Sequence, residues 1–203
     1  MRIFKFGGAS VKDAKGVKNL IAVLEQVGHE NTMIVVSAMG KTTNALELVI
    51  GNYFDNKKEL QSAIQEVIKY HNNIILDLFE NENHPVFKTT NTFFEELKSF
   101  LKTNKSPDYN FVYDQVIGFG ELLSTTIISQ YLAIQGFDNQ WLDVRQLIKT
   151  DDYYRRANVN WEQTQQLVTK NIDTKKLNIT QGFLGSDKNN FTTTLGREGS
   201  DYT

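Results

Sequence analysis

The sequence predicts an α/β protein whose sheet framework is interrupted by a helical insertion. Near the start, a strand, a glycine turn, a helix and a second strand follow one another within residues 2–36. Further on, residues 52–117 contain no glycine and carry apolar residues at helical spacing. The order strand, helix, strand indicates a right-handed unit with parallel strands. The glycine-free stretch indicates the insertion.

The first unit is defined by two strand segments and one amphipathic helix. Residues 2–6 are predicted to form a strand that runs into Gly7-Gly8. Residues 11–27 place their apolar side chains on one helical stripe, and Gly28 provides a left-handed stop. Residues 33–36 form a continuous apolar run, typical of a strand that is covered on both faces.

The rest of the chain alternates helices with short strands. Apolar spacing predicts helices over residues 60–78 and 93–101, and a third from near Asp108 towards Gly136. A short strand is predicted at 140–143, followed by a helix from the N-cap Asn160 to about residue 171. The last two strands are predicted over residues 178–184 and 191–195, and a polar turn over residues 185–189 joins them.

Composition excludes several classes of function. The chain has 203 residues and a net charge of −2, so no electrostatic feature recruits nucleic acid or an anionic membrane. It has no cysteine, which excludes disulfides and thiolate chemistry. Its three histidines are scattered, and we predict no metal site made by protein side chains alone. With no signal-peptide pattern and no apolar run of membrane length, a cytoplasmic protein is expected.

Two segments at strand ends carry candidate ligand-binding groups. Lys5-Phe6-Gly7-Gly8 follows the first strand, and its glycines allow backbone N–H groups to approach an anion. Because ligands bind at the carboxyl ends of parallel strands, Ser37 is expected at the same edge. The segment 37–44 supplies further hydroxyl donors, although an ordinary turn with Thr43 or Asn44 as N-cap explains it equally well.

Two later segments carry charged candidates. Glu121 follows two glycines, Gly118 and Gly120, in an apolar helix, where close approach of another element is expected. A buried acid needs a partner, either a ligand ammonium or an internal lysine or arginine. Arg197 lies between Gly196 and a carboxylate at Asp201, and its planar fork suits a substrate carboxylate.

Taken in order along the chain, these segments resemble the aspartate kinases of the amino-acid kinase family. The matching segments span the sequence from one end to the other: Lys5–Val11, Val35–Gly40, Thr43-Asn44, Gly120–Ser124, Asp143–Arg145, Gly182–Gly185 and Thr192–Tyr202. The resemblance implies a three-layer α/β/α sandwich with a mostly parallel sheet. It also implies that residues 1–203 are the N-terminal portion of a catalytic domain, with the helical insertion at about 52–117.

The resemblance implies transfer of the γ-phosphoryl group of ATP, with Mg²⁺, to the side-chain carboxylate of L-aspartate. That carboxylate is already ionised at pH 7, so alignment and charge neutralisation replace a general base. Lys5 and Asp201 are implied as catalytic residues, Lys5 by stabilising the transferring group. The implied phosphate-binding residues are Lys5, Gly7, Gly8 and Ser10. The implied aspartate-binding residues are Ser37, Thr43, Glu121, Phe183 and Arg197.

Three departures from the family pattern bear on these expectations. Ala9 stands where threonine is common, and Glu198 stands where glycine is often found. The family continues beyond the equivalent of Thr203 with the rest of the kinase domain and then regulatory ACT domains. We therefore expect little or no kinase activity from residues 1–203 alone. We also expect self-association through an exposed sheet edge or helix-facing surface, and a homo-oligomer for the full-length protein.

Two alternative functions stay open at this point. A related kinase of the same family acting on N-acetylglutamate, glutamate or a nucleotide monophosphate is the first. Glu121 argues against an acylated substrate, because an acyl group removes the ammonium that this acid would bind. A non-catalytic module that senses an amino acid is the second, and it predicts aspartate binding that does not depend on Lys5.

Overall fold

The computed structural model describes residues 1–81 and 83–196. Its main sheet has four parallel strands in the order β1-β2-β4-β3. Their bounds are β1 (Arg2–Phe6), β2 (Thr32–Val36), β3 (Asn139–Leu142) and β4 (Leu177–Gln181). A separate antiparallel pair follows, β5 (Leu184–Ser186) and β6 (Thr192–Thr194). The predicted α/β class and the mostly parallel sheet are confirmed.

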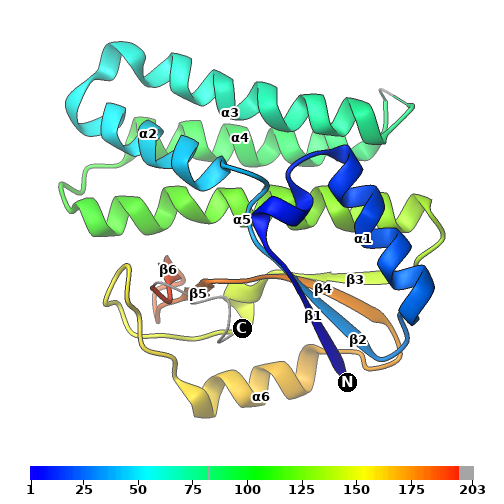
Figure 1. Cartoon of the computed structure of the whole chain (residues 1–203). Coiled ribbons are helices and arrows are strands. Elements are labelled where there is room, and N and C mark those ends of the chain that lie inside the picture. The colour runs from blue at the N-terminus through cyan, green and yellow to red at the C-terminus, as the bar shows by residue number, and fades with distance from the viewer. Residues whose placement is uncertain (82, 197–203) are drawn as a thin grey trace.

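Helices cover both faces of the main sheet. Figure 1 shows α1 (Ala14–Val27) and α5 (Tyr109–Ile134) on one side and α6 (Trp161–Asn171) on the other. Alternate residues of β2 face the two layers: Ile34 and Val36 pack with α1 and α5, whereas Met33 and Val35 pack against α6. All five residues of β2 are buried, as the apolar run predicted. The three-layer sandwich is confirmed.

A further helical layer lies beyond α5. Figure 1 shows α2 (Thr42–Asp55), α3 (Lys57–Leu78) and α4 (Pro85–Thr103) stacked on the far side of α5 from the sheet. They share a second apolar core with the first half of α5, which includes Leu46, Ile50, Ile64, Val67, Phe94, Leu97, Val116 and Ile117. The range 52–117 runs from the end of α2 through α3 and α4 to the first residues of α5, so α2 begins before it and α5 ends after it.

Helix ends follow the capping chemistry of the sequence, with one correction. Asp108 and Asn160 cap α5 and α6, and their side chains accept hydrogen bonds from the N–H groups of Asn110 and Gln163. The helix predicted from Val11 begins later, because the Asp13 side chain caps it by accepting from Gly16 N at 2.8 Å. Residues Gly8–Val11 instead form a short 3-10 helix, η1.

The strand predicted over 178–184 is wrong in its second half. β4 ends at Gln181, whose buried side chain accepts from Val144 N at 2.8 Å and donates to Thr125 Oγ1 at 2.6 Å. Phe183 then adopts a left-handed backbone with φ of 72°. The chain turns there into β5, so Gly185, predicted in a turn, lies in a strand. The strand predicted over 191–195 is confirmed, although β6 is shorter.

Helix α5 is the central element of the core. Within the described ranges, it is the helix with the length and apolar composition needed to cross a membrane, and 78% of its most apolar window is buried inside the protein. It contacts β3, β4, β6, α2 and α4. Burial on all sides identifies it as a core helix that links the sheet to the helical layer.

Candidate active site

The carboxyl ends of β1 and β2 carry the first group of candidate residues. Phe6 pairs with Val36 in parallel register, and Ser37 N donates to Phe6 O at 3.1 Å. Lys5, Gly7 and Ser37 therefore lie at one edge of the sheet, as the strand order predicted. Lys5 and Gly7 are exposed there, so their polar groups face the side of the sheet where ligands bind.

The two glycines of the first turn have different roles. A Cβ on Gly8 would lie 2.4 Å from Ala38 O, so the backbone after β2 leaves no room for a side chain. Gly40 N donates to Gly8 O at 2.9 Å, which fastens the two turns together. A Cβ on Gly7 would meet no atom of residues 1–81 or 83–196 within 4 Å, so Gly7 borders open space in this part of the chain. Ser10 donates its N–H to Gly7 O and keeps its side chain exposed.

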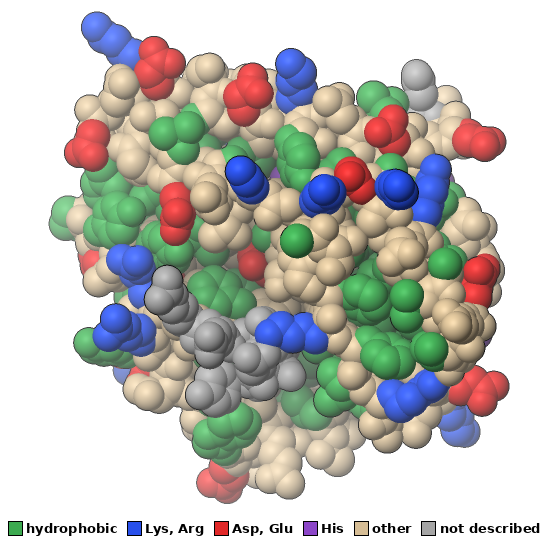
Figure 2. All heavy atoms as spheres, in the orientation of Figure 1, with side chains coloured by type: hydrophobic (Ala, Val, Ile, Leu, Met, Phe, Trp, Pro, Cys, Tyr) green, Lys and Arg blue, Asp and Glu red, His purple; other side chains and the backbone are tan. Residues whose placement is uncertain are grey.

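Positive charge gathers around this edge. Figure 2 shows several Lys and Arg side chains in a row across the middle of the molecule, over the region where β1 leads into α1 and β2 leads into α2. Lys12 and Lys41 lie in these two connections, and Lys5 and Lys15 lie beside them on β1 and α1; all four are exposed. Such a cluster raises the local concentration of anions and suits a polyphosphate.

Helix α5 passes directly against the turn after β2. A Cβ on Gly120 would lie 3.0 Å from Ala38 Cβ, and one on Gly118 would lie 3.1 Å from Thr192 Cγ2. Ser124 Oγ donates to Ser37 O at 2.8 Å. The close approach predicted from the two helical glycines is confirmed. It brings α5 side chains to the edge that carries Ser37.

Glu121 is the most unusual of these side chains. It is 4% exposed, and one carboxyl oxygen accepts a long hydrogen bond from Ala38 N at 3.4 Å. The other oxygen, Oε2, is buried and has no hydrogen-bond partner among the described residues. No ion pair joins Glu121 to a lysine or arginine of residues 1–81 or 83–196, so the alternative of an internal salt bridge finds no support there. Burial raises its pKa to about 8.

Thr43 and Phe183 come from separate elements, α2 and the turn between β4 and β5. Helix α2 begins at Thr42 with Lys41 as N-cap, so Thr43 and Asn44 do not cap it and that alternative is wrong. Thr42 is buried and donates to Met39 O at 2.6 Å, whereas Thr43 is half-buried. Phe183, in its left-handed turn, lies beside a cavity of about 880 Å³.

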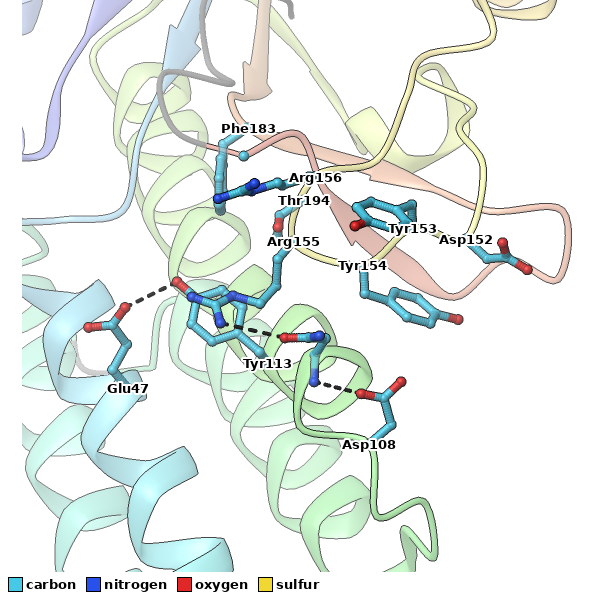
Figure 3. A pocket seen from close by; sticks show the side chains of 12 residues that line it. Glu47, Asp108, Tyr113, Asp152, Tyr153, Tyr154, Arg155, Arg156, Phe183 and Thr194 are labelled. Atoms are coloured by element: carbon cyan, nitrogen blue, oxygen red, sulfur yellow. Dashed lines mark hydrogen bonds between the residues drawn. The ribbon is translucent and has the colours of Figure 1, made fainter.

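That cavity opens between α2, α5 and the segment 152–156. Figure 3 shows Arg155 lying over the ring of Tyr113, with Glu47 bonded to the Tyr113 hydroxyl. Phe183 and Arg156 lie at its other end. Glu47 stands one helical turn after Thr43 on α2, so the cavity adjoins the predicted aspartate-binding residues. Gly196, which precedes Arg197, also lines it.

Three candidate residues cannot be placed. Arg197, Glu198 and Asp201 lie outside the described residues. Within residues 1–81 and 83–196, no group of three His, Asp or Glu side chains is arranged to hold a metal ion.

Sequence reasoning missed a second buried acid on α5, Asp114. It is fully buried and accepts three hydrogen bonds, from Arg155 N, Thr194 N and Thr194 Oγ1, at 2.8 to 2.9 Å. Burial raises its pKa to about 6, against the opposing effect of these bonds. An acid amid the apolar residues 112–117 was the available signal, and it is the same signal that identified Glu121.

Comparisons with known proteins agree with this architecture. The Amino acid kinase family matches residues 1–203. The lysine-sensitive aspartokinase 3 of Escherichia coli is 29% identical over 99% of this chain and 44% of its own length. Aspartokinase 1, chloroplastic, of Arabidopsis thaliana is 33% identical over 99% of this chain and 36% of its own length. The chain therefore spans less than half the length of these relatives.

Solved structures give the same result. A crystal structure of Escherichia coli aspartokinase III in complex with aspartate and ADP superposes with a TM-score of 0.88 and 26% identity, covering 100% of this chain and 45% of that one. A second structure of that enzyme, with lysine and aspartate, superposes equally well. The sequence and fold are thus similar to the N-terminal catalytic part of aspartokinases, and the chain belongs to the amino acid kinase family.

Proposed function

We propose that this chain supplies the aspartate-binding half of an aspartate kinase site, with part of the site for the phosphates of ATP. Buried Glu121, with an unpartnered carboxyl oxygen, carries the proposal. A buried charge requires a partner of opposite sign, and the α-ammonium of an amino acid has the charge and donors to supply it. The complex of Escherichia coli aspartokinase III with aspartate and ADP supports the choice of ligands.

The phosphate groups of ATP are assigned to the edge formed by β1 and η1. Gly7 borders open space, and Lys5 and Ser10 are exposed beside it. The lysines around this edge neutralise negative charge, which is the main requirement of phosphoryl transfer. Mg²⁺ bound to the ATP phosphates would supply further charge neutralisation.

The amino acid is assigned to the space between Glu121, Thr43 and Phe183. Glu121 would hold the ammonium, and Arg197 would pair with a carboxylate through two parallel hydrogen bonds. Ser37 is held in place by the Ser124 hydroxyl on its carbonyl, which fixes the turn that borders the site. The side-chain carboxylate is then free to face the phosphate edge, where it attacks as an ionised nucleophile.

Calorimetric titration of the chain with L-aspartate tests the proposal. N-acetyl-L-aspartate has the same carboxylates without the ammonium, and N-acetyl-L-glutamate tests the related kinase. We expect saturable binding of L-aspartate alone, lost in Glu121→Gln and Arg197→Ala. Glu47→Gln is the matched control, because Glu47 is an exposed acid of the neighbouring cavity. Preference for an acetylated acid would rule out the aspartate assignment.

A further inference from the structure

One helix of the outer layer, α3, reaches the turns that form the phosphate edge. Its first half packs in the second apolar core, through residues such as Val67. Its last turns pack in the core that contains α1 and β2, through residues such as Ile75. Tyr70 and His71 lie between these two halves. Because both cores hold α3, the helix gives these two side chains a fixed position.

The Tyr70 hydroxyl is bonded to one of the two turns at this edge. We call residues 7–12, after β1, the first turn and residues 37–41, after β2, the second turn. The Tyr70 O–H donates to Lys12 O, which lies between η1 and α1. The ring is half-buried and packs against the core of the sheet. The exposed Lys12 side chain is thus carried by a backbone that this hydroxyl holds.

The same hydroxyl lies against the second turn. Gly40 has a left-handed backbone with φ of 56°, and a Cβ there would overlap the Tyr70 oxygen and lie 3.3 Å from Lys12 Cβ. Gly40 N in turn donates to Gly8 O at 2.9 Å. The two turns and the hydroxyl therefore meet at Gly40, the residue that precedes the exposed Lys41.

His71 packs behind the second turn. It is fully buried, and its Nδ1 lies 2.8 Å from Val67 O, so this nitrogen carries the proton. Its Nε2 lies 3.5 Å from Thr42 Oγ1, the hydroxyl that donates to Met39 O. Burial lowers the pKa of His71 to about 4, so the ring is neutral at pH 7 and contributes packing rather than charge. Helix α3 therefore contacts the second turn at Gly40 and again at the start of α2.

We propose that Tyr70 is a positioning residue whose hydroxyl, bonded to the first turn and packed against the second, fixes the separation of the two turns of the phosphate edge. A polyphosphate binds more tightly to cations and N–H donors that are held in place beforehand, because binding then costs less ordering. Lys12 and Lys41 both extend from backbone that meets this hydroxyl. The inference rests on the proposed function in one respect, that this edge binds the phosphates of ATP.

Tyr70→Phe tests the inference, because it removes the hydroxyl and keeps the ring. Tyr53→Phe is the matched control. Tyr53 is also half-buried, and its hydroxyl donates to Asn104 O at 3.3 Å and accepts from Asn104 Nδ2 at 3.1 Å, so the control removes no fewer bonds. Tyr53 lies near the end of α2, about 16 Å along the axis from Thr42.

Three measurements separate positioning from general stability. The first is hydrogen exchange of the Gly40 amide, which is bonded across the two turns. The others are the affinities for L-aspartate and for inorganic tripolyphosphate, which has the phosphates of ATP without the nucleoside. For Tyr70→Phe we expect faster exchange and weaker tripolyphosphate binding, each by about three- to tenfold. We expect unchanged L-aspartate affinity, because Glu121 is carried by α5. Tyr53→Phe should keep wild-type values in all three.

Each outcome decides a separate part of the inference. Unchanged exchange at Gly40 in Tyr70→Phe overturns the positioning role. Faster exchange with unchanged tripolyphosphate affinity overturns its link to phosphate binding. An equal loss of L-aspartate affinity, or an equal change in Tyr53→Phe, also overturns it by showing a general loss of stability. If the wild-type chain does not bind tripolyphosphate, the proposed phosphate edge fails for this chain, and exchange at Gly40 alone then decides whether Tyr70 holds the two turns.

Discussion

Two buried carboxylates on one face of α5 differ in how completely they are bonded. Asp114 accepts three hydrogen bonds of 2.8 to 2.9 Å, from two separate segments. Glu121, two turns along, accepts one long bond and leaves Oε2 without a partner. A fully bonded buried acid stabilises the protein around it, whereas an incompletely bonded one is stable only when neutral or when a ligand completes it. The contrast shows that Asp114 is a structural acid, and it supports the proposal that Glu121 binds a ligand.

The largest effect is expected from removing the bonded acid. Asp114→Ala should lower the free energy of unfolding by about 3 kcal/mol or more, because two buried N–H groups and a hydroxyl lose their acceptor. Chemical denaturation measures this loss. Asp114→Asn should lose much less, since its amide can satisfy the same three groups. Equal losses in the two variants would show that the charge matters more than the bonds.

Substitution of Glu121 is expected to have a smaller effect, and to raise the free energy of unfolding rather than lower it, by an amount that depends on pH. The folded protein keeps this group protonated up to a pKa of about 8, whereas the unfolded chain loses the proton near 4.5. The folded state therefore binds more protons between these values, and stability falls as pH rises through the window. Glu121→Gln removes this dependence. We compare the free energy of unfolding of Glu121→Gln with that of the wild type. We expect the variant to gain on the order of a few kcal/mol over the wild type between pH 4.5 and pH 8.5.

Denaturation curves at pH 4.5, 6.5 and 8.5 check this prediction. Asp114 contributes in the same direction, because its pKa is raised from 3.8 to about 6, but both proteins carry it and its contribution cancels in the difference between them. If the difference in free energy of unfolding between wild type and Glu121→Gln stays the same from pH 6.5 to 8.5, Glu121 is already ionised in the unliganded protein.

Aspartate binding should release the proton that Glu121 carries in the unliganded protein. Below pH 8, Glu121 must lose its proton before it can pair with an ammonium, so affinity falls by up to about tenfold for each pH unit below that value. Titrations at pH 6 in buffers of different ionisation enthalpy measure the proton released, which we expect to approach one per aspartate. Release of no proton at pH 6 contradicts the assignment of Glu121 to the ammonium.

The smallest effect is expected from a third acid on the same helix. Asp108 is exposed and caps α5 by accepting from Asn110 N at 2.9 Å. Asp108→Ala should cost about 1 kcal/mol, as loss of an N-cap does, and should leave aspartate affinity unchanged. A large loss of affinity in this variant would show that any damage to α5 reaches the site, which would weaken the distinction between Asp114 and Glu121.

The sequence predicted the features that depend on local signals. The signals for the first strand, the glycine turn and the following helix lie within a few residues of one another. The two glycines before Glu121 predicted a close contact, which α5 makes with Ala38. Glu121 itself was identified because an acid in an apolar helix lacks a local partner. Asp114 carried the same signal and was overlooked, and its structural role could not be predicted because its partners are 41 and 80 residues away in the chain.

The errors near the end of the sheet have a similar cause. Residues 178–184 have the pattern of one strand, but the chain breaks at Gly182-Phe183. The break depends on the Gln181 side chain, which hydrogen-bonds to Val144 and Thr125 in other parts of the chain. The start of α1 was placed too early for a more local reason. Asp13 is a good N-cap, and the apolar stripe that begins before it concealed the boundary.

The protonation state of Glu121 can be observed directly by the carbon-13 resonance of its side-chain carboxyl, assigned by comparison with Glu121→Gln. At pH 7 we predict the chemical shift of a neutral acid in the unliganded chain. Saturating L-aspartate should move it to that of a carboxylate, and N-acetyl-L-aspartate should leave it unmoved. A carboxylate signal without ligand, or a neutral acid with aspartate bound, would contradict the role of Glu121 as the ammonium-binding group.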